Sequence, residues 1–177
     1  MKKIIYSSLI LAGVLLIFNS CNSSGKQQGL VYFNDFESAQ GWLPGLLFCN
    51  FPVHSGIMAC KIDSSHPYGP TLRMKFDDIS PRQIKKVKYS IWCYMKTKNT
   101  QGKLVVSVDG GGKQNILYEA KDMRDVVKEI GKWVELKGEC SLNRNGFNNP
   151  ANTINIYPWN TSKEEVVVDD MQVTFVP

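Results

Sequence analysis

The stretch EVVVDDMQVTF, residues 165–175, decides the fold of this chain. Successive residues of an extended strand point to opposite faces, so its odd-numbered side chains share one face. These are Val167, Asp169, Met171, Val173 and Phe175. Four of the five are apolar, which predicts that this face is buried. A carboxylate among them needs hydrogen bonds, a cationic partner or a bound cation, so we expect Asp169 to hold something in place.

Short alternating segments of the same kind recur along the chain. The candidate strands are 30–36, 57–63, 71–76, 86–96, 103–109, 114–119, 133–142, 153–157 and 165–176. Clusters of Gly, Pro and Asn separate these segments, and only 123–130 is predicted to be helical. Short strands with turns at this spacing are typical of an all-β fold, a sandwich or a barrel, and we expect a two-sheet antiparallel β-sandwich over residues 30–177.

The first 20 residues are predicted to be a signal peptide rather than part of the fold. Lys2 and Lys3 precede an apolar run over 4–18, which is too short and too one-sided for a membrane span. Cys21 directly follows the small residue Ser20, which favours cleavage at this point and lipidation of Cys21. Residues 21–29 would be a polar tether to a membrane of the cell envelope, facing either the periplasm or the exterior. Ordinary secretion with a spare Cys21 thiol is the alternative.

Charge and cysteine content narrow the classes of protein to which this chain can belong. The formal net charge is +5, and without Lys2 and Lys3 there remain 19 basic and 16 acidic residues. These charges are scattered and form no basic stripe, so we expect no nucleic-acid partner. The remaining 157 residues suit one domain. Four cysteines remain: Cys49, Cys60, Cys93 and Cys140. An exported chain permits disulfides, of which Cys49–Cys60 is the favoured pair, although buried free thiols are also common.

Three short motifs carry a resemblance to a known group of proteins. They are Phe33-Asn34-Asp35-Phe36-Glu37 followed by Gly41-Trp42, then His54-Ser55-Gly56, and finally Val166-Val167-Val168-Asp169-Asp170-Met171. In this order and spacing the chain resembles the calcium-stabilised jelly-roll carbohydrate-binding modules of the galactose-binding-like superfold. The resemblance implies a jelly-roll sandwich whose first and last strands meet.

The same resemblance implies a structural calcium ion between those strands. It places Glu37 and Asp169 as carboxylate ligands, with oxygens near Asp35 and Gly56 as further ligands. Calcium prefers six to eight hard oxygen ligands, which suits such a set. The alternative is that Glu37 and Asp169 accept hydrogen bonds from the backbone or from Lys or Arg, without a metal.

The function that these features favour is non-catalytic binding of a polysaccharide. Sugars present apolar faces and many hydroxyls, so their sites combine flat aromatic rings with planar polar groups. The outward positions of the strands 71–76, 86–96 and 153–157, with one aromatic just beyond, supply such residues. The candidates for stacking are Trp92, Tyr94, Tyr157 and Trp159, and those for hydrogen bonding are Arg73 and Asn155. For any single aromatic residue, burial under a loop is the alternative.

Two other classes of function remain open. A structural subunit of a cell-envelope assembly, with no sugar site, would suit the same fold. A glycan hydrolase would need two carboxylates across a cleft, and no spacing brings Glu119 and Glu135 together. His54 and His66 lack a nucleophile elbow, and their spacing from Cys49 and Cys60 is a weak zinc pattern.

Overall fold

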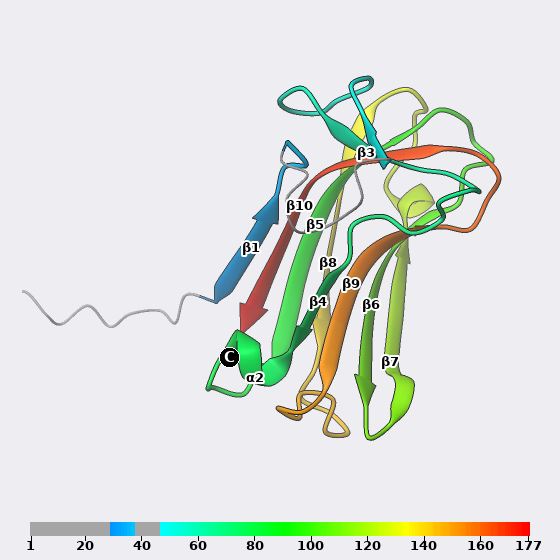
Figure 1. Ribbon diagram of the computed structural model, residues 1–177. Coiled ribbons are helices and arrows are strands. Elements are labelled where there is room, and N and C mark those ends of the chain that lie inside the picture. Colours follow the sequence, from blue (N-terminus) through cyan, green and yellow to red (C-terminus); the bar gives the residue numbers. More distant parts are fainter. Residues whose placement is uncertain (1–28, 38–46) are drawn as a thin grey trace, which may run out of the picture.

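The computed structural model describes residues 29–37 and 47–177. The predicted signal peptide, Cys21 and the tether up to residue 28 lie outside these residues, as do Gly41 and Trp42. Within these residues, ten strands form two antiparallel sheets that pack face to face (Figure 1). The prediction of an all-β, two-sheet antiparallel jelly-roll sandwich is confirmed.

The larger sheet, sheet A, has six strands in the order β2-β3-β10-β5-β8, with β1 also paired to β10. Its members are β1 (Leu30–Asn34), β2 (Phe48–Cys49), β3 (Ala59–Ile62), β5 (Lys86–Met95), β8 (Trp133–Ser141) and β10 (Val166–Val176). The smaller sheet, sheet B, has the order β4-β9-β6-β7. Its members are β4 (Leu72–Lys75), β6 (Gly102–Gly110), β7 (Lys113–Asp122) and β9 (Thr153–Asn160).

The core lies between the sheets because each central strand alternates apolar and polar side chains. On β5 the side chains of the even-numbered residues point outward, while Val87, Ile91 and Cys93 are fully buried against sheet B. On β9, Ile154 and Ile156 do the same from the other side. This alternation leaves each sheet with an outer face, and a binding site on a sandwich can be built there.

Several boundaries differ from the prediction. The predicted helix over 123–130 is wrong beyond its first turn, since only the 3₁₀ helix η2 (Met123–Asp125) forms, capped by the Asp122 side chain. A four-residue helix, α2 (Phe76–Ile79), follows β4 directly. The strand predicted over 153–157 continues to Asn160. Pro158 lies opposite Leu104 of β6, and the pairing of the two strands extends to Gly102 opposite Asn160.

The final strand contains a β-bulge that the alternating pattern did not reveal. Asp169 pairs with Trp92 and Gln172 pairs with Ser90, so β10 carries one extra residue, and Asp170 adopts a left-handed φ of 46°. Val166 and Val168 therefore face the core before the bulge, and Met171 and Val173 face it afterwards. The prediction that Val167 and Asp169 share a face with Met171 is wrong. Asp169 lies on the outer side of sheet A, yet it is completely buried.

The four cysteines of the described residues are free thiols, so the predicted Cys49–Cys60 disulfide does not form. In the β2–β3 pair, Cys60 stands opposite Phe48, and Cys49 stands opposite Ala59. Residues directly opposite share a face, so the side chains of Cys49 and Cys60 point to different sides of the sheet. No helix among residues 29–37 and 47–177 is long and apolar enough to cross a membrane.

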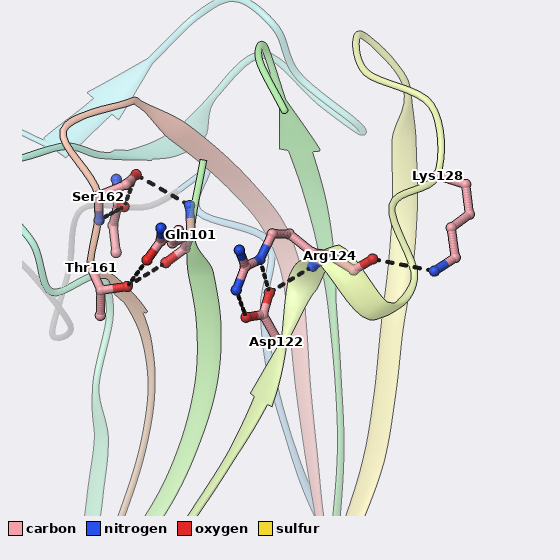
Figure 2. Close-up of polar contacts among 7 residues, drawn as sticks. Gln101, Asp122, Arg124, Lys128, Thr161 and Ser162 are labelled. Carbon is pink, nitrogen blue, oxygen red and sulfur yellow. Dashed lines mark hydrogen bonds and ion pairs between the residues drawn. The ribbon is translucent and has the colours of Figure 1, made fainter. Parts of the chain in front are cut away.

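Polar contacts between loops and strand ends fasten one end of sheet B, as Figure 2 shows. Arg124 forms an ion pair with Asp122 at the end of β7, with Nη2 2.6 Å from Oδ2. The Thr161 hydroxyl donates to the Gln101 carbonyl at 3.1 Å, which ties the segment after β9 to the segment before β6. These contacts fix the ends of the strands whose middle sections form the site described next.

Candidate functional site

A groove of about 280 Å³ lies on the outer face of sheet B. It is lined by Tyr68, Thr71, Arg73, Ser107, Asp109, Gln114, Asn115, Asn155 and Tyr157. All four strands of the sheet or the loops beside them contribute to it. We call this feature the groove.

The sheet register brings the groove residues together. Arg73 on β4 pairs with Asn155 on β9, and Asn155 pairs in turn with Ser107 on β6. Ser107 pairs with Tyr118 on β7, so one row of four side chains crosses the sheet. Directly paired residues point to the same face, and on β4, β6 and β9 their neighbours along the strand pack in or against the core. The row is therefore held on the outer face by the same alternation that builds the core.

Aromatic rings form one side of the groove. Tyr68 lies parallel to Trp159, with ring centroids 6.0 Å apart and an interplanar angle of 9°. Tyr68 also meets Tyr157 in an edge contact at 5.9 Å. The Lys103 ammonium lies 5.7 Å from the centre of the Trp159 ring. Tyr68 remains 54% exposed, so its ring is open to a ligand.

The segment that carries Tyr68 is tied along β9. The Gly69 amide donates to the Pro158 carbonyl at 2.9 Å, and the Asn160 amide donates to the Pro67 carbonyl at 2.8 Å. Tyr68 itself forms a β-bridge with Trp159. These backbone contacts fix the segment from which the Tyr68 ring projects.

The polar floor of the groove is internally ordered. The Asn155 side-chain amide donates to Asp109 Oδ2 at 3.0 Å and lies 3.5 Å from Ser107 Oγ. The Asn115 backbone amide donates to the other Asp109 oxygen at 2.9 Å. These bonds hold Asp109 as a fixed acceptor. Burial raises the pKa of Tyr157, with Tyr118 and Tyr68 adding to the effect, so its hydroxyl remains a donor at neutral pH.

The structure brings together only part of the predicted sugar site. Arg73, Asn155 and Tyr157 line the groove, and Trp159 stacks against its Tyr68. Trp92 and Tyr94 belong to β5 in sheet A, so they are not part of the groove.

Trp92 and Tyr94 instead belong to an aromatic cluster, which we define as His54, Trp92, Tyr94 and Trp133. The His54 ring stacks on Trp92 with centroids 3.7 Å apart and an interplanar angle of 16°. Trp133 contacts both His54, at 5.7 Å, and Tyr94, at 5.5 Å. All four side chains are partly buried. The loop that carries His54 therefore covers the outer face of sheet A at this point.

Sequence reasoning missed several groove residues, and Tyr68 is the most important of them. It lies in the segment 66–70, which reads as a turn because of its two prolines and glycine. Ser107 and Asp109 had a detectable signal, since both occupy outward positions of a clearly alternating strand. Gln114 and Asn115 follow a glycine turn, where alternation does not predict the face of the sheet to which a side chain points.

The predicted calcium ligands hold the 54–58 segment through hydrogen bonds. Asp169 Oδ2 accepts from the backbone amides of His54 at 2.9 Å and Ser55 at 3.3 Å, while its Oδ1 accepts from Asp170 at 2.9 Å. Burial raises the pKa of Asp169, and these three amides oppose the shift. The neighbouring Asp170 contacts His54 Nδ1 at 2.6 Å and the Ser55 hydroxyl at 2.9 Å.

Glu37 contacts the same segment further along. Its Oε1 accepts from the backbone amides of Ile57 at 2.8 Å and Met58 at 3.0 Å. Gly56 has a φ of 60°, and a Cβ there would collide with the Glu37 carboxylate. Asp35 is used locally, since its Oδ1 accepts from the Glu37 amide at 3.1 Å.

Backbone hydrogen bonds, the alternative to calcium, account for the positions of Glu37 and Asp169 in this structure. Amide hydrogens already point at three of their four carboxylate oxygens, and a cation would meet the positive ends of those dipoles. Within the described part of the chain, no three His, Cys, Asp or Glu side chains group closely enough to hold a metal. The predicted meeting of the two chain ends does occur, since Asn34 of β1 pairs with Met171 of β10.

No protein-family model matches the sequence, and no curated protein matches it. Several solved structures do share its fold. The chain is similar to the CBM22-1 xylan-binding domain of Xyn10C from Paenibacillus barcinonensis, with 17% identity and a TM-score of 0.56, covering 86% of this chain and 98% of that one. It is also similar to the C-terminal family 22 carbohydrate-binding module of Xyn10B from Clostridium thermocellum, with 15% identity, a TM-score of 0.58 and the same two coverages.

A third similar structure is the xylan-binding module CBM15, with 7% identity and a TM-score of 0.52, covering 83% of this chain and 97% of that one. At such identities the likeness establishes a shared jelly-roll sandwich and leaves the ligand of this chain to be argued from its own groove.

Proposed function

We propose that this protein binds a polysaccharide in the groove of sheet B and catalyses no reaction. The observation that carries the proposal is the pairing of aromatic rings, of which Tyr68 is exposed, with ordered polar groups on one open face. The apolar face of a pyranose ring can lie on Tyr68, while its hydroxyls reach Asp109 and Asn155. The similar structures support the proposal, because they are xylan-binding or carbohydrate-binding modules.

The acidic groups of the groove support binding rather than hydrolysis. Glycosidases generally use two carboxylates on either side of the scissile bond. Asp109 is the single carboxylate among the nine residues that line the groove, and Asn155 and Asn115 hold both of its oxygens. Glu135, which the sequence offered as a partner for Glu119, is on β8 of sheet A. A binding protein of this type would hold its ligand with an affinity on the order of micromolar to millimolar, or about −8 to −4 kcal/mol.

The location of the protein is a separate part of the proposal. The positive start, the apolar run over 4–18 and Cys21 support export and lipid attachment at a membrane of the cell envelope. An anchored protein with an open groove would retain polysaccharide near the cell. Mass spectrometry of the protein from its native membrane tests this: a diacylglyceryl adduct on an N-terminal Cys21 is expected, and an unmodified Cys21 contradicts it. The structural calcium ion stays a prediction and has no part in the groove.

The test of binding compares two tryptophans of equal size on opposite sheets. Purified protein, Trp159→Ala and Trp92→Ala are applied to a glycan array, and hits are quantified by affinity electrophoresis. We expect Trp159→Ala to bind about tenfold more weakly, because Trp159 supports the Tyr68 ring, and Trp92→Ala to bind unchanged. Loss of binding in Trp92→Ala alone would move the site to sheet A. An unaltered protein that binds no glycan would reject the proposal.

A further inference from the structure

Arg73 is a cation of the groove without a carboxylate partner. It lines the groove and its side chain is exposed. In the stretches 29–37 and 47–177 it takes part in no salt bridge, whereas Arg124 at the end of the same sheet is paired with Asp122. A guanidinium in a ligand groove with five free donors is chemically suited to an oxyanion such as a carboxylate, which it can bind through two parallel hydrogen bonds.

The groove carboxylate does not neutralise Arg73. Asp109 accepts from the Asn155 amide on one oxygen and from the Asn115 backbone on the other, at 3.0 Å and 2.9 Å. Asn155 stands between Arg73 and the strand that carries Asp109, because β9 separates β4 from β6. The two charged groups therefore lie on the same face, separated by an amide, and each is available to a different part of a ligand.

The surroundings of the groove add positive charge. Lys75 follows Arg73 on the same face of β4, and Lys103 stands opposite Trp159 on β6. Asp122, opposite Lys103, is already engaged by Arg124. Neither Lys75 nor Lys103 forms a salt bridge within the described residues. An anionic ligand would thus meet an excess of unpaired cations along this face.

From this geometry we propose that the ligand of the groove is an acidic polysaccharide and that Arg73 binds the carboxylate of a uronic acid residue. The inference rests on the proposed function, since it names the ligand class of the same groove. The guanidinium fork binds a carboxylate through two parallel hydrogen bonds, while Tyr68 and Tyr157 contact the sugar ring and Asp109 accepts from hydroxyls. Arg73 thereby determines specificity for uronate over neutral sugar.

The experiment uses matched ligands that differ only in charge. Glucuronoxylan, homogalacturonan and alginate are each tested in native form and after chemical reduction of their carboxylates to primary alcohols. Affinity is measured by isothermal titration or affinity electrophoresis for the unaltered protein, Arg73→Ala, Arg73→Lys and Lys88→Ala. Lys88 is an exposed cation on β5 of sheet A, so Lys88→Ala removes the same charge from the opposite sheet.

We expect the unaltered protein to prefer at least one native polysaccharide over its reduced form by about tenfold, and Arg73→Ala to lose about tenfold on the native form and less than about twofold on the reduced form. Arg73→Lys should recover part of the loss, and Lys88→Ala should resemble the unaltered protein. Equal affinity for native and reduced forms, or an equal loss on both, overturns the inference and leaves the proposed function standing. Absence of binding to every acidic and neutral glycan rejects the proposed function as well.

Discussion

The outer faces of sheet A and sheet B both carry aromatic side chains at outward strand positions. On sheet A, the aromatic cluster is closed, because the His54 ring lies flat on Trp92 at 3.7 Å and Asp169 holds the His54 and Ser55 amides beneath it. On sheet B, the Tyr68 and Trp159 rings lie parallel, and Tyr68 keeps 54% of its surface exposed. On both sheets a loop residue lies on an outward strand ring; the difference is that His54 is partly buried within its cluster, whereas Tyr68 leaves its own ring open as a candidate sugar platform.

The largest effect that would separate the two faces is on stability. Trp92→Ala should lower the free energy of unfolding by about 2–3 kcal/mol, because it removes the ring on which His54 stacks and leaves a cavity under the 54–58 segment. Urea denaturation measures this, and glycan retention measured below the transition should not change. Trp159→Ala is the matched variant. It should weaken glycan retention and lower the free energy of unfolding by less than Trp92→Ala does. Equal losses of stability from both substitutions would remove the distinction.

A smaller effect concerns the groove hydroxyl. Tyr157→Phe should weaken glycan binding about threefold, since one hydroxyl donor is lost while the ring remains. Burial raises the pKa of Tyr157, so its hydroxyl stays protonated as pH rises through the ordinary tyrosine value and is lost only above it. Binding should therefore stay constant between about pH 7 and pH 9. Titration of affinity against pH tests this, and a decline within that window would show that Tyr157 ionises earlier than its surroundings imply.

The smallest expected effect is that of a chelator. Because backbone amides already occupy the Glu37 and Asp169 oxygens, EDTA should leave the thermal midpoint within about one degree of its original value. Differential scanning calorimetry with EDTA, and again after added calcium, measures the shift. A fall of several degrees that calcium reverses would restore the metal predicted from the sequence, and would show that the 54–58 segment rearranges around it.

The fold could be predicted because alternation is a local property. Each strand of 86–96 or 153–157 carries its own pattern, and the apolar parity marks the core side without knowledge of the partner. Strand β10 is the exception. The bulge at Asp169 and Asp170 reverses the parity of β10, and a reader who follows alternation through it assigns Asp169 to the wrong face. Its burial was still predicted correctly, because the 54–55 turn covers the side chain from outside.

The site was predictable only in part, because it depends on contacts between distant segments. Arg73, Asn155 and Tyr157 share a groove since the order β4-β9-β6 places their strands side by side, and no sequence pattern states that order. From the sequence, Trp92 looked equivalent to Trp159, because tertiary packing and not the strand pattern decides what covers an outward ring. Tyr68 was missed because a bridge to Trp159 fixes it in a segment that otherwise reads as a turn.

The pairing of β1 with β10 has a practical consequence. Leu30 stands opposite Phe175, so the chain enters and leaves the domain at neighbouring points of sheet A (Figure 1). The groove belongs to the other sheet. A fusion partner or an immobilising tag at either terminus would therefore present the groove in nearly the same orientation. A short linker that joins the two ends would allow new termini to be opened in a loop away from the groove, to produce a circular permutant with an unaltered binding face.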